Sequence, residues 1–247
     1  IYFLFLLVPI YWLLNMSFKS NTEILGGLSL WPQNFTLDNY RVIFTDRSWY
    51  EGYLNSLYYV SLNTLISLSV ALPAAYAFSR FRIPLADDLL FFILSTRMMP
   101  PVAVAIPIYL MYRQLNLTDT RLGMILLYTA VNVSLAVWLL KGFIDEIPRE
   151  YEEAALVDGY TRLQALRKVV LPQAVTGIAA TAIFCLIFSW NEYAFAVLLT
   201  SGEAQTMPPF IPFIIGEGGQ DWPAVAAATT LFVVPIVMFT VLLRKHL

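Results

Sequence analysis

The sequence is poor in the side chains that carry out chemistry in most enzymes. Its 247 residues include one cysteine, Cys185, and one histidine, His246. A single thiol cannot form a disulfide within the chain, and we interpret Cys185 as a small hydrophobic residue buried in an apolar run. A zinc site built from histidine and cysteine is excluded by these counts. The Gly-x-x-x-x-Gly-Lys-Ser/Thr phosphate loop is also missing, so we do not expect this chain itself to be a P-loop ATPase.

Charged residues are scarce as well. They make up 13% of the chain, and the formal net charge is −2, which offers no basic field for nucleic acid. Hydrophobic residues, in contrast, make up 59%, and the mean hydropathy is +0.67. A soluble domain of this size is far less apolar. The composition therefore predicts an integral membrane protein surrounded by lipid bilayer.

The apolar runs are long enough for helices. A helix needs about 20 residues to cross the hydrocarbon layer, whereas a barrel strand needs only about 10 residues of alternating character. We therefore predict an all-α membrane protein with one domain and six spans. The spans are expected at about 1–14, 53–79, 89–112, 122–140, 173–199 and 224–243. The first lacks a starting Met and a basic segment, so we interpret it as the remaining part of a helix rather than a signal peptide.

The third predicted span contains features that interrupt a helix. Each of Pro100, Pro101 and Pro107 removes a backbone donor and disfavours helix in the residue before it, so we expect a kinked or broken span. Such breaks persist in a membrane only where protein or water covers them. The segments 15–52 and 200–222 are expected to be loops outside the membrane. The second is long enough to be functional or to cap the mouth of the bundle, and both interpretations stay open.

A polar region at 145–172 separates the fourth and fifth spans. Pro148 and the acids that follow it favour a helix start, and Gly159 favours a stop. Thr161 and Gln164 then form a capping-box pattern that begins a second helix. The region has too many charges to enter a bilayer, so we expect a helix, a turn and a helix at the membrane surface.

The distribution of basic residues predicts the orientation of the chain. Nine lie on the same side as this polar region, and five lie on the opposite side, which favours a cytoplasmic location for the larger set. The larger set is Arg80, Arg82, Lys141, Arg149, Arg162, Arg167, Lys168, Arg244 and Lys245. The smaller set is Lys19, Arg41, Arg47, Arg113 and Arg121.

The polar region also contains a spaced motif. The run Glu153-Ala154-Ala155, three residues, Gly159, nine residues and then Val169-Val170-Leu171-Pro172 resembles the EAA signature of the membrane subunits of ABC importers, E-A-A-x3-G-x9-I-x-L-P. Val169 in place of Ile is the one departure. The resemblance implies the type I importer permease fold, with a cytoplasmic coupling helix seated in a cleft of a separate ATP-binding subunit.

The resemblance also implies roles for single residues. Glu153 would be a charged contact, Ala154 and Ala155 the close-packed face, and Gly159 the bend, with Asp158 in the same segment. Leu171 and Pro172 would set the start of the fifth span. Force from the ATP-binding subunits would then reach the fourth and fifth spans through this region.

Other features resemble the carbohydrate permeases, in particular the smaller, maltose-type partner. These are the run from Trp190 to Tyr193, the broken third span, the long outer loop and the number of spans. The resemblance implies a bacterial cytoplasmic (inner) membrane protein that is not an enzyme and binds no cofactor or metal. A second permease subunit, two ATP-binding subunits that hold ATP and Mg, and an extracytoplasmic sugar-binding protein would be its partners.

The implied solute is a sugar, with a disaccharide such as trehalose or maltose preferred. A polyol, a peptide or a polyamine is an alternative within the same class, although a polyamine would favour several acids in the spans. A secondary transporter without an ATPase is a further alternative, and it too would favour more intramembrane acids than this sequence has.

Two charged residues lie within predicted spans, and charge at membrane depth usually faces inward. Arg97 and Glu192 are therefore candidates for the solute path or for a pair with each other. Further candidates share polar or aromatic side chains in the spans: Asn132 and Asn191 for hydroxyl groups, and Tyr128, Trp190 and Tyr193 for stacking on a sugar. Packing and interhelical hydrogen bonds are the alternative role for each of them.

Overall fold

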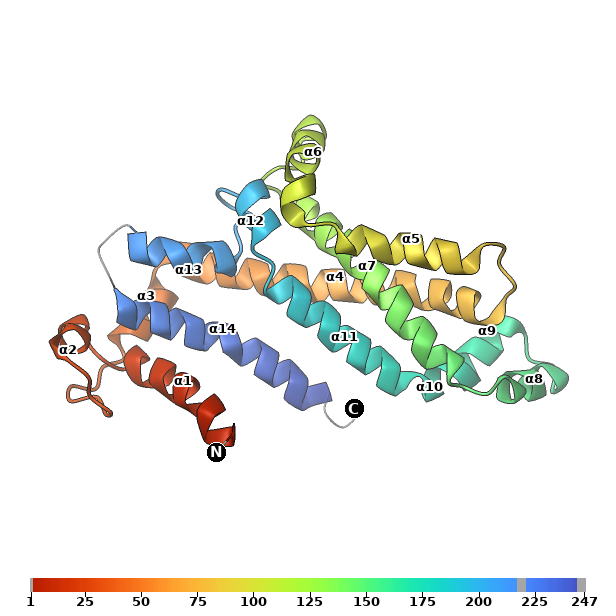
Figure 1. The fold of residues 1–247 in the computed structure, drawn as a ribbon, viewed down its shortest axis with the longest axis horizontal. Coiled ribbons are helices and arrows are strands. Elements are labelled where there is room, and N and C mark those ends of the chain that lie inside the picture. The colour runs from red at the N-terminus through yellow and green to blue at the C-terminus, as the bar shows by residue number, and fades with distance from the viewer. Residues whose placement is uncertain (1, 217–220, 244–247) are drawn as a thin grey trace.

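A computed structural model of the chain describes residues 2–216 and 221–243 (Figure 1). Arg244, Lys245 and His246, which the sequence analysis named, lie outside the described residues. Every regular element in the described part is helical. The elements are α1 (Tyr2–Ser17), α2 (Asn21–Gly26), α3 (Asp38–Thr45), α4 (Arg47–Arg80), α5 (Ala86–Met98), α6 (Pro101–Gln114), α7 (Arg121–Asp145), α8 (Arg149–Val157), α9 (Arg162–Ala165), a π-helical turn (Leu166–Val170), α10 (Leu171–Gln173), α11 (Val175–Trp190), α12 (Ala194–Leu199), α13 (Met207–Gly216) and α14 (Trp222–Leu243).

Several of these helices are apolar enough to cross a membrane. In the described part of the chain, α4, α7 and α14 have the length and composition of single spans. The α5–α6 pair and the pair formed by Arg162–Gln173 and α11 also qualify, but they bend by 90° and 74°. The shorter helix α1 is apolar too. The predicted all-α membrane fold is confirmed, and the number of six spans stays a prediction.

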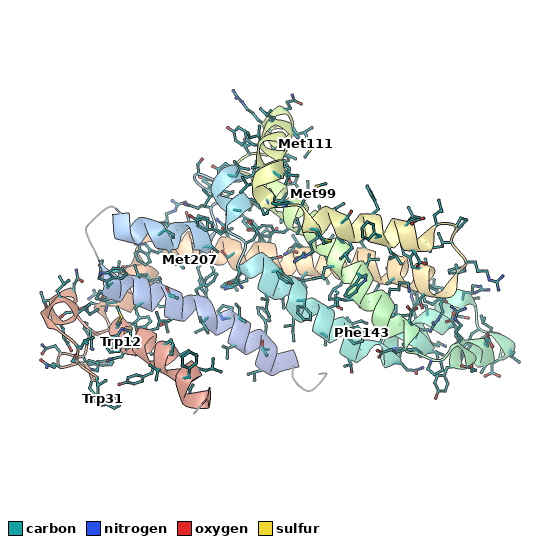
Figure 2. All side chains as sticks on the ribbon, in the orientation of Figure 1. Trp12, Trp31, Met99, Met111, Phe143 and Met207 are labelled. Atoms are coloured by element: carbon teal, nitrogen blue, oxygen red, sulfur yellow. The ribbon has the colours of Figure 1, made fainter. Side chains whose placement is uncertain are left out.

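The centre of the bundle is the crossing of α4, α7 and α11, which pack against one another over much of their length (Figure 1). Small side chains from two of these helices, including Ala71, Ala75 and Ala136, are fully buried there and let the helices approach closely. Gly177 on α11 has the same role, because a Cβ atom built on it would lie 2.3 Å from Cγ of Phe143 on α7. Figure 2 shows Phe143 between these two helices.

The third span is broken, as the prolines predict. Helix α5 ends at Met98, Met99 is extended, and Pro100 and Pro101 begin α6 in a new direction. Figure 2 shows Met99 at this elbow. Helix α6 then leaves α5 and contacts α12 instead. The break brings the start of α6 beside the middle of the bundle.

The fifth span departs from the continuous segment expected at 173–199. Its helix α11 ends at Trp190, and α12 begins at Ala194. Between them, the carboxylate of Glu192 accepts hydrogen bonds from the backbone N–H groups of Phe195 and Ala196 at 2.9 and 3.0 Å. The first backbone N–H groups of a helix have no partner within that helix. The Glu192 carboxylate accepts two of them at the start of α12, as the side chain at the N-terminus of a helix often does.

The sequence analysis expected a loop at 200–222. The structure shows that this outer segment also contains a helix, α13. This helix packs against α4 and α14, with Met207 buried. The turn before it is held by Asp119, whose Oδ1 accepts the N–H groups of Ser201, Gly202 and Ala204 at 3.2–3.3 Å. Asn55 on α4 donates to two carbonyl groups of the same turn.

Candidate functional site

The predicted surface helices lie together at one end of the bundle. Helices α8, α9 and α10 gather there beside the last turn of α4 and the end of α7, while α2, α3 and α13 lie toward the opposite end (Figure 1). This arrangement places the whole 145–172 region outside the central crossing of α4, α7 and α11.

The predicted helix, turn and helix is confirmed. Helix α8 begins after Pro148, its first turn contains acids, and it ends at Val157. Gly159 adopts a φ of +87°, a left-handed conformation that favours glycine. Thr161 and Gln164 form both hydrogen bonds of a capping box at the start of α9.

Helix α8 is fastened to α4 by a buried ion pair. The Nε group of Arg80 donates to Glu152 at 3.0 Å, and the two side chains are 5% and 7% exposed. The hydroxyl of Tyr76, one turn earlier on α4, donates to the other oxygen of the same carboxylate. Both oxygens of a buried charge are thus satisfied by one helix, so α8 cannot separate from α4 without leaving charges unpaired.

Further hydrogen bonds extend this anchor to the end of α7. The Nη2 group of Arg80 donates to the carbonyl of Ile147 at 2.9 Å, and Arg149 donates to the carbonyl of Ser79 at 2.7 Å. The hydroxyl of Ser79 donates to Asp145 at 2.5 Å. The segment between α7 and α8 is therefore connected to α4 on both sides of the ion pair.

The opposite face of α8 is open. Glu153, Ala154 and Val157 are exposed, and Val157 is 87% exposed. Ala155, which the sequence analysis placed on the same contact face as Ala154, is 6% exposed. Helix α8 packs on α9 and on the π-helical turn. The structure thus divides the two alanines: Ala155 packs within the chain, and Ala154 faces outward with Glu153.

The remaining motif residues lie on the path from α8 to the fifth span. Asp158 caps the end of α8 and is exposed, as is Gly159. Leu171 and Pro172 begin the short α10, and the chain direction changes by 74° between Gln173 and Val175, where α11 begins. The straight helix therefore starts three residues after Pro172.

Sequence reasoning missed the anchor. Glu152 was assigned only to the acids of a first helical turn, and Arg80 only to the basic residues that set orientation. The adjacent acids in fact differ sharply, because Glu152 is buried and Glu153 is exposed. Neighbouring residues in an α-helix point about 100° apart, so the sequence indicates that Glu152 and Glu153 face different directions. It does not indicate that Arg80 is the partner of Glu152.

A second candidate site lies in the middle of the bundle. A cavity of about 170 Å³ is bounded by α5, the starts of α6 and α12, α7 and α11. Its lining includes Arg97, Tyr128, Asn132, Phe188, Ser189 and Glu192. It therefore brings together four of the predicted path residues. A larger surface groove of about 590 Å³ runs between α5 and α7 and reaches the end of α7 that precedes α8.

The two charged residues of the cavity do not pair with each other. Nη1 of Arg97 donates to the carbonyl of Val131 at 3.0 Å and to Asn132 at 3.4 Å, and its guanidinium lies 4.2 Å from the ring centre of Phe188. Glu192 accepts the backbone N–H groups that begin α12. No ion pair in the described part of the chain includes either residue. The direct pair left open by the sequence is not formed.

Asn132 is the centre of a buried hydrogen-bond network. Its amide nitrogen donates to Asn63 Oδ1 on α4 at 2.7 Å, and to Ser189 Oγ and the Cys185 carbonyl on α11 at 2.6 and 3.2 Å. Asn132 is 1% exposed. The side chain thus joins three helices at their crossing and also orients Arg97.

The other path candidates lie outside the cavity. The indole of Trp190 is 1% exposed, donates to the carbonyl of Phe232 at 2.8 Å and stacks on that ring, so it fastens α11 to α14. Asn191 is exposed and donates to the carbonyl of Ile187 at 2.8 Å. Tyr193 precedes α12 and is 48% exposed. The structure does not bring these three side chains into the cavity.

The described residues contain no group of three or more His, Cys, Asp and Glu side chains arranged to hold a metal ion. The two candidate sites are the exposed face of α8 at one end of the bundle and a small polar cavity between α5, α7 and α11.

Comparison with known proteins gives a consistent result. Residues 64–247 match the family described as binding-protein-dependent transport system inner membrane component. The trehalose transport system permease of Mycobacterium tuberculosis is 32% identical over 98% of this chain and 89% of its own. The sulfoquinovosyl glycerol transport system permease of Agrobacterium fabrum is 31% identical over 97% and 85%.

A solved structure shows the same fold. A chain from a bacterial ABC transporter involved in the import of the acidic polysaccharide alginate superposes with a TM-score of 0.83 and 26% identity, covering 99% of this chain and 91% of that one. The EAA-like motif begins in the surface helix α8 and ends in α10, the bundle is apolar, and the family match covers most of the chain. The chain is a multi-pass permease of the family of binding-protein-dependent transport system inner membrane components.

Proposed function

We propose that this chain is the smaller permease subunit of an ATP-driven importer that moves a sugar across the bacterial cytoplasmic membrane by alternating access. A second permease subunit completes the membrane channel. Two ATP-binding subunits, which hold ATP and Mg, hydrolyse the nucleotide, and an extracytoplasmic sugar-binding protein delivers the solute. The chain itself is not an enzyme.

The observation that carries this proposal is the asymmetry of α8. One face is locked to α4 through Glu152, and the other presents Glu153, Ala154 and Val157 without a partner in the described part of the chain. Tyr151, Val157 and Tyr160 are exposed on α8 and the turn that follows it, and apolar side chains that gather beside charges on a surface are typical of a protein interaction site. An ATP-binding subunit is the occupant that accounts for both faces, because force applied to the outer face reaches α4 through a buried ion pair.

The orientation follows from the same surface. The basic residues that outnumber those on the opposite side include Arg80, Arg149 and Arg162, and all three lie near α8. The excess of Lys and Arg favours the cytoplasm for this end of the bundle. The coupling helix α8 then faces the nucleotide-hydrolysing subunits, and α13 faces the sugar-binding protein.

For the solute, a disaccharide such as trehalose or maltose is favoured. The trehalose permease named above is among the similar chains and matches nearly the whole length. The sulfoquinovosyl glycerol permease, which is about as similar, shows that the class of solute is broader than disaccharides. A polyol, peptide or polyamine is the alternative that a transport assay distinguishes.

The test is uptake and ATP hydrolysis by the complete complex in proteoliposomes. Glu153→Lys reverses the charge on the docking face, so we expect an assembled complex whose sugar uptake falls while the ATPase no longer responds to loaded binding protein. Glu146→Lys, a charge reversal before α8 and outside the motif, is the matched control. Normal coupled uptake by the Glu153→Lys complex would contradict the proposal.

A further inference from the structure

The cavity at the centre of the bundle has a feature that packing does not explain. Arg97 is half-buried, and only its Nη1 group makes hydrogen bonds in the described part of the chain. An ionised side chain at membrane depth is costly and is retained where it has a partner or a function. The guanidinium stacks on Phe188, which leaves its Nε and Nη2 donors for another acceptor.

Glu192 lines the same cavity as Arg97. Its carboxylate oxygens accept two backbone N–H groups, and the hydroxyl of Tyr128, which also lines the cavity, interacts with the same carboxylate. A tyrosine hydroxyl that donates can still accept a hydrogen bond, so Glu192 and Tyr128 together present acceptors to the cavity. The lining thus offers donors from Arg97 and acceptors from Glu192 and Tyr128. Such a combination suits adjacent hydroxyl groups, each of which both donates and accepts.

The backbone around the cavity is arranged for a solute as well. Pro101 begins α6 and Phe195 lies in the first turn of α12, and both line the cavity at the two breaks in the third and fifth spans. Interrupted helices at membrane depth are tolerated where they border a cavity, and solute sites in transporters are often formed there. The helix breaks before α6 and α12 and the guanidinium of Arg97, which has no ion-pair partner in the described residues, are independent observations. Both indicate a solute site in this cavity.

The volume limits what this chain can bind alone. A cavity of about 170 Å³ is smaller than the ~300 Å³ at which pockets for whole small molecules begin. It accommodates part of a solute, such as one sugar ring. The remainder would then contact the second permease subunit.

We propose that this chain supplies a subsite for one uncharged sugar ring, in which Arg97 donates to a hydroxyl, Glu192 accepts from its neighbour, and Tyr128 and Phe195 border the ring. Asn132 is a positioning residue, because its network with Asn63 and Ser189 holds the wall of the cavity and its Oδ1 orients Arg97. The subsite rests on the proposed function of sugar import, but it can be tested by binding alone.

The binding test uses thiol protection in the purified four-subunit complex. Cys185→Ala removes the natural thiol, and Val131→Cys then places a reporter in the cavity wall. Trehalose and maltose are the probes, with a small water-soluble methanethiosulfonate as the reagent. At a sugar concentration ten times the Kd, occupancy slows labelling about tenfold. Val42→Cys, on an exposed position of α3 outside the predicted spans, is the control that the reagent labels and that sugar does not protect.

Arg97→Met then tests the chemistry. Hydrogen bonds to a charged donor are worth about 1.5–3 kcal/mol, so this substitution should raise the protecting sugar concentration about tenfold or more. Arg113→Met, the same substitution at an exposed position of α6, should leave protection unchanged. If the Arg97→Met complex does not assemble, Arg97→Lys, which keeps the charge but not the planar donors, should weaken protection in the same direction.

The outcomes separate the subsite from the proposed function. Protection of Val131→Cys that Arg97→Met weakens supports the subsite. Absence of protection by either sugar, or protection that Arg97→Met and Arg97→Lys leave unchanged, overturns it. Protection without ATP-driven uptake in proteoliposomes would support the subsite and contradict the importer function.

Discussion

Glu152 on α8 and Arg80 at the end of α4 form an ion pair at 3.0 Å, although 72 residues separate them in the sequence. Both side chains are almost fully buried, and Tyr76 donates to the same carboxylate. Movement of α8 therefore acts on the second span directly. The resemblance of the motif implies that force reaches the fourth and fifth spans, and in the proposed mechanism the anchor adds α4 to that path.

Loss of either partner should loosen α8. Glu152→Ala leaves Arg80 buried without its carboxylate, which we expect to reduce the free energy of unfolding by roughly 3–5 kcal/mol. Uptake should fall in parallel, because α8 no longer pulls on α4. Thermal unfolding of the purified complex measures the first effect, and proteoliposome uptake measures the second.

The matched control is the exposed pair Arg47 and Glu51 near the other end of the bundle, at 2.6 Å. Their side chains are 75% and 39% exposed, so solvent screens the pair and Arg47→Ala should leave the melting temperature of the complex nearly unchanged. Similar losses from Glu152→Ala and Arg47→Ala would show that burial does not strengthen the anchor.

The turn after α8 depends on a left-handed residue. Gly159 has a φ of +87°, and a side chain with a branched Cβ is strained there by about 1–2 kcal/mol. We expect Gly159→Val to destabilise the turn and to lower the sugar imported per ATP hydrolysed. Gly159→Asn should be better tolerated because asparagine visits this conformation. Equal coupling in the Val and Asn variants would show that the bend is not limiting.

The close contact between α7 and α11 requires the absence of a side chain at position 177. A Cβ atom there would lie 2.3 Å from Cγ and 2.5 Å from Cβ of Phe143. Since Cβ of Phe143 moves only with the backbone, Gly177→Ala should force the helices apart and cost about 1–3 kcal/mol. Thermal unfolding measures this cost.

Two comparisons sharpen this prediction. Phe143→Ala combined with Gly177→Ala should not restore stability, because the Cβ at position 143 remains. Gly142→Ala, next to Phe143 on the same helix, meets no atom within 4 Å and should not destabilise the protein. Full rescue by the double variant would show that ring packing, rather than backbone separation, sets the cost.

One carboxylate outside the spans predicts a dependence on pH. Backbone N–H donation from Gln33 at 2.8 Å, supported by Asn34 and Ser29, lowers the pKa of Glu23. A carboxylate whose pKa is lower in the folded state stabilises that state above its unfolded pKa, and the contribution disappears as pH falls through the folded pKa. The segment 27–34 should therefore loosen below about pH 4.5, the ordinary value for this group.

Limited proteolysis measures this loosening, with a protease active at neutral pH for the upper range and an acid-active protease for the lower range. Glu23→Gln removes the charge, so at neutral pH the 27–34 segment of the variant should be cleaved more easily than that of the wild type. The two proteins should be cleaved alike once the wild-type carboxyl is protonated. A difference between the two proteins that persists unchanged into strong acid would contradict the role of this charge.

Much of the coupling region was predictable because its signals are local. The capping box at Thr161, the left-handed turn at Gly159 and the charges of α8 act within a few residues of chain. The break at Pro100 was predictable for the same reason, since proline removes its own donor. The break after Trp190 was not predictable, because it depends on the Glu192 carboxylate accepting the backbone N–H groups at the start of α12.

The sequence by itself determined that the chain is a helical membrane protein, because composition and the length of apolar runs set the solvent that each segment prefers. It also determined the position and turn of α8. Only the tertiary structure decided that Glu152 faces Arg80, that Ala155 is buried while Ala154 is exposed, and that Arg97 and Glu192 share a cavity without pairing. These outcomes depend on contacts between helices far apart in the chain, and local propensity contains no information about which side chains such packing brings together.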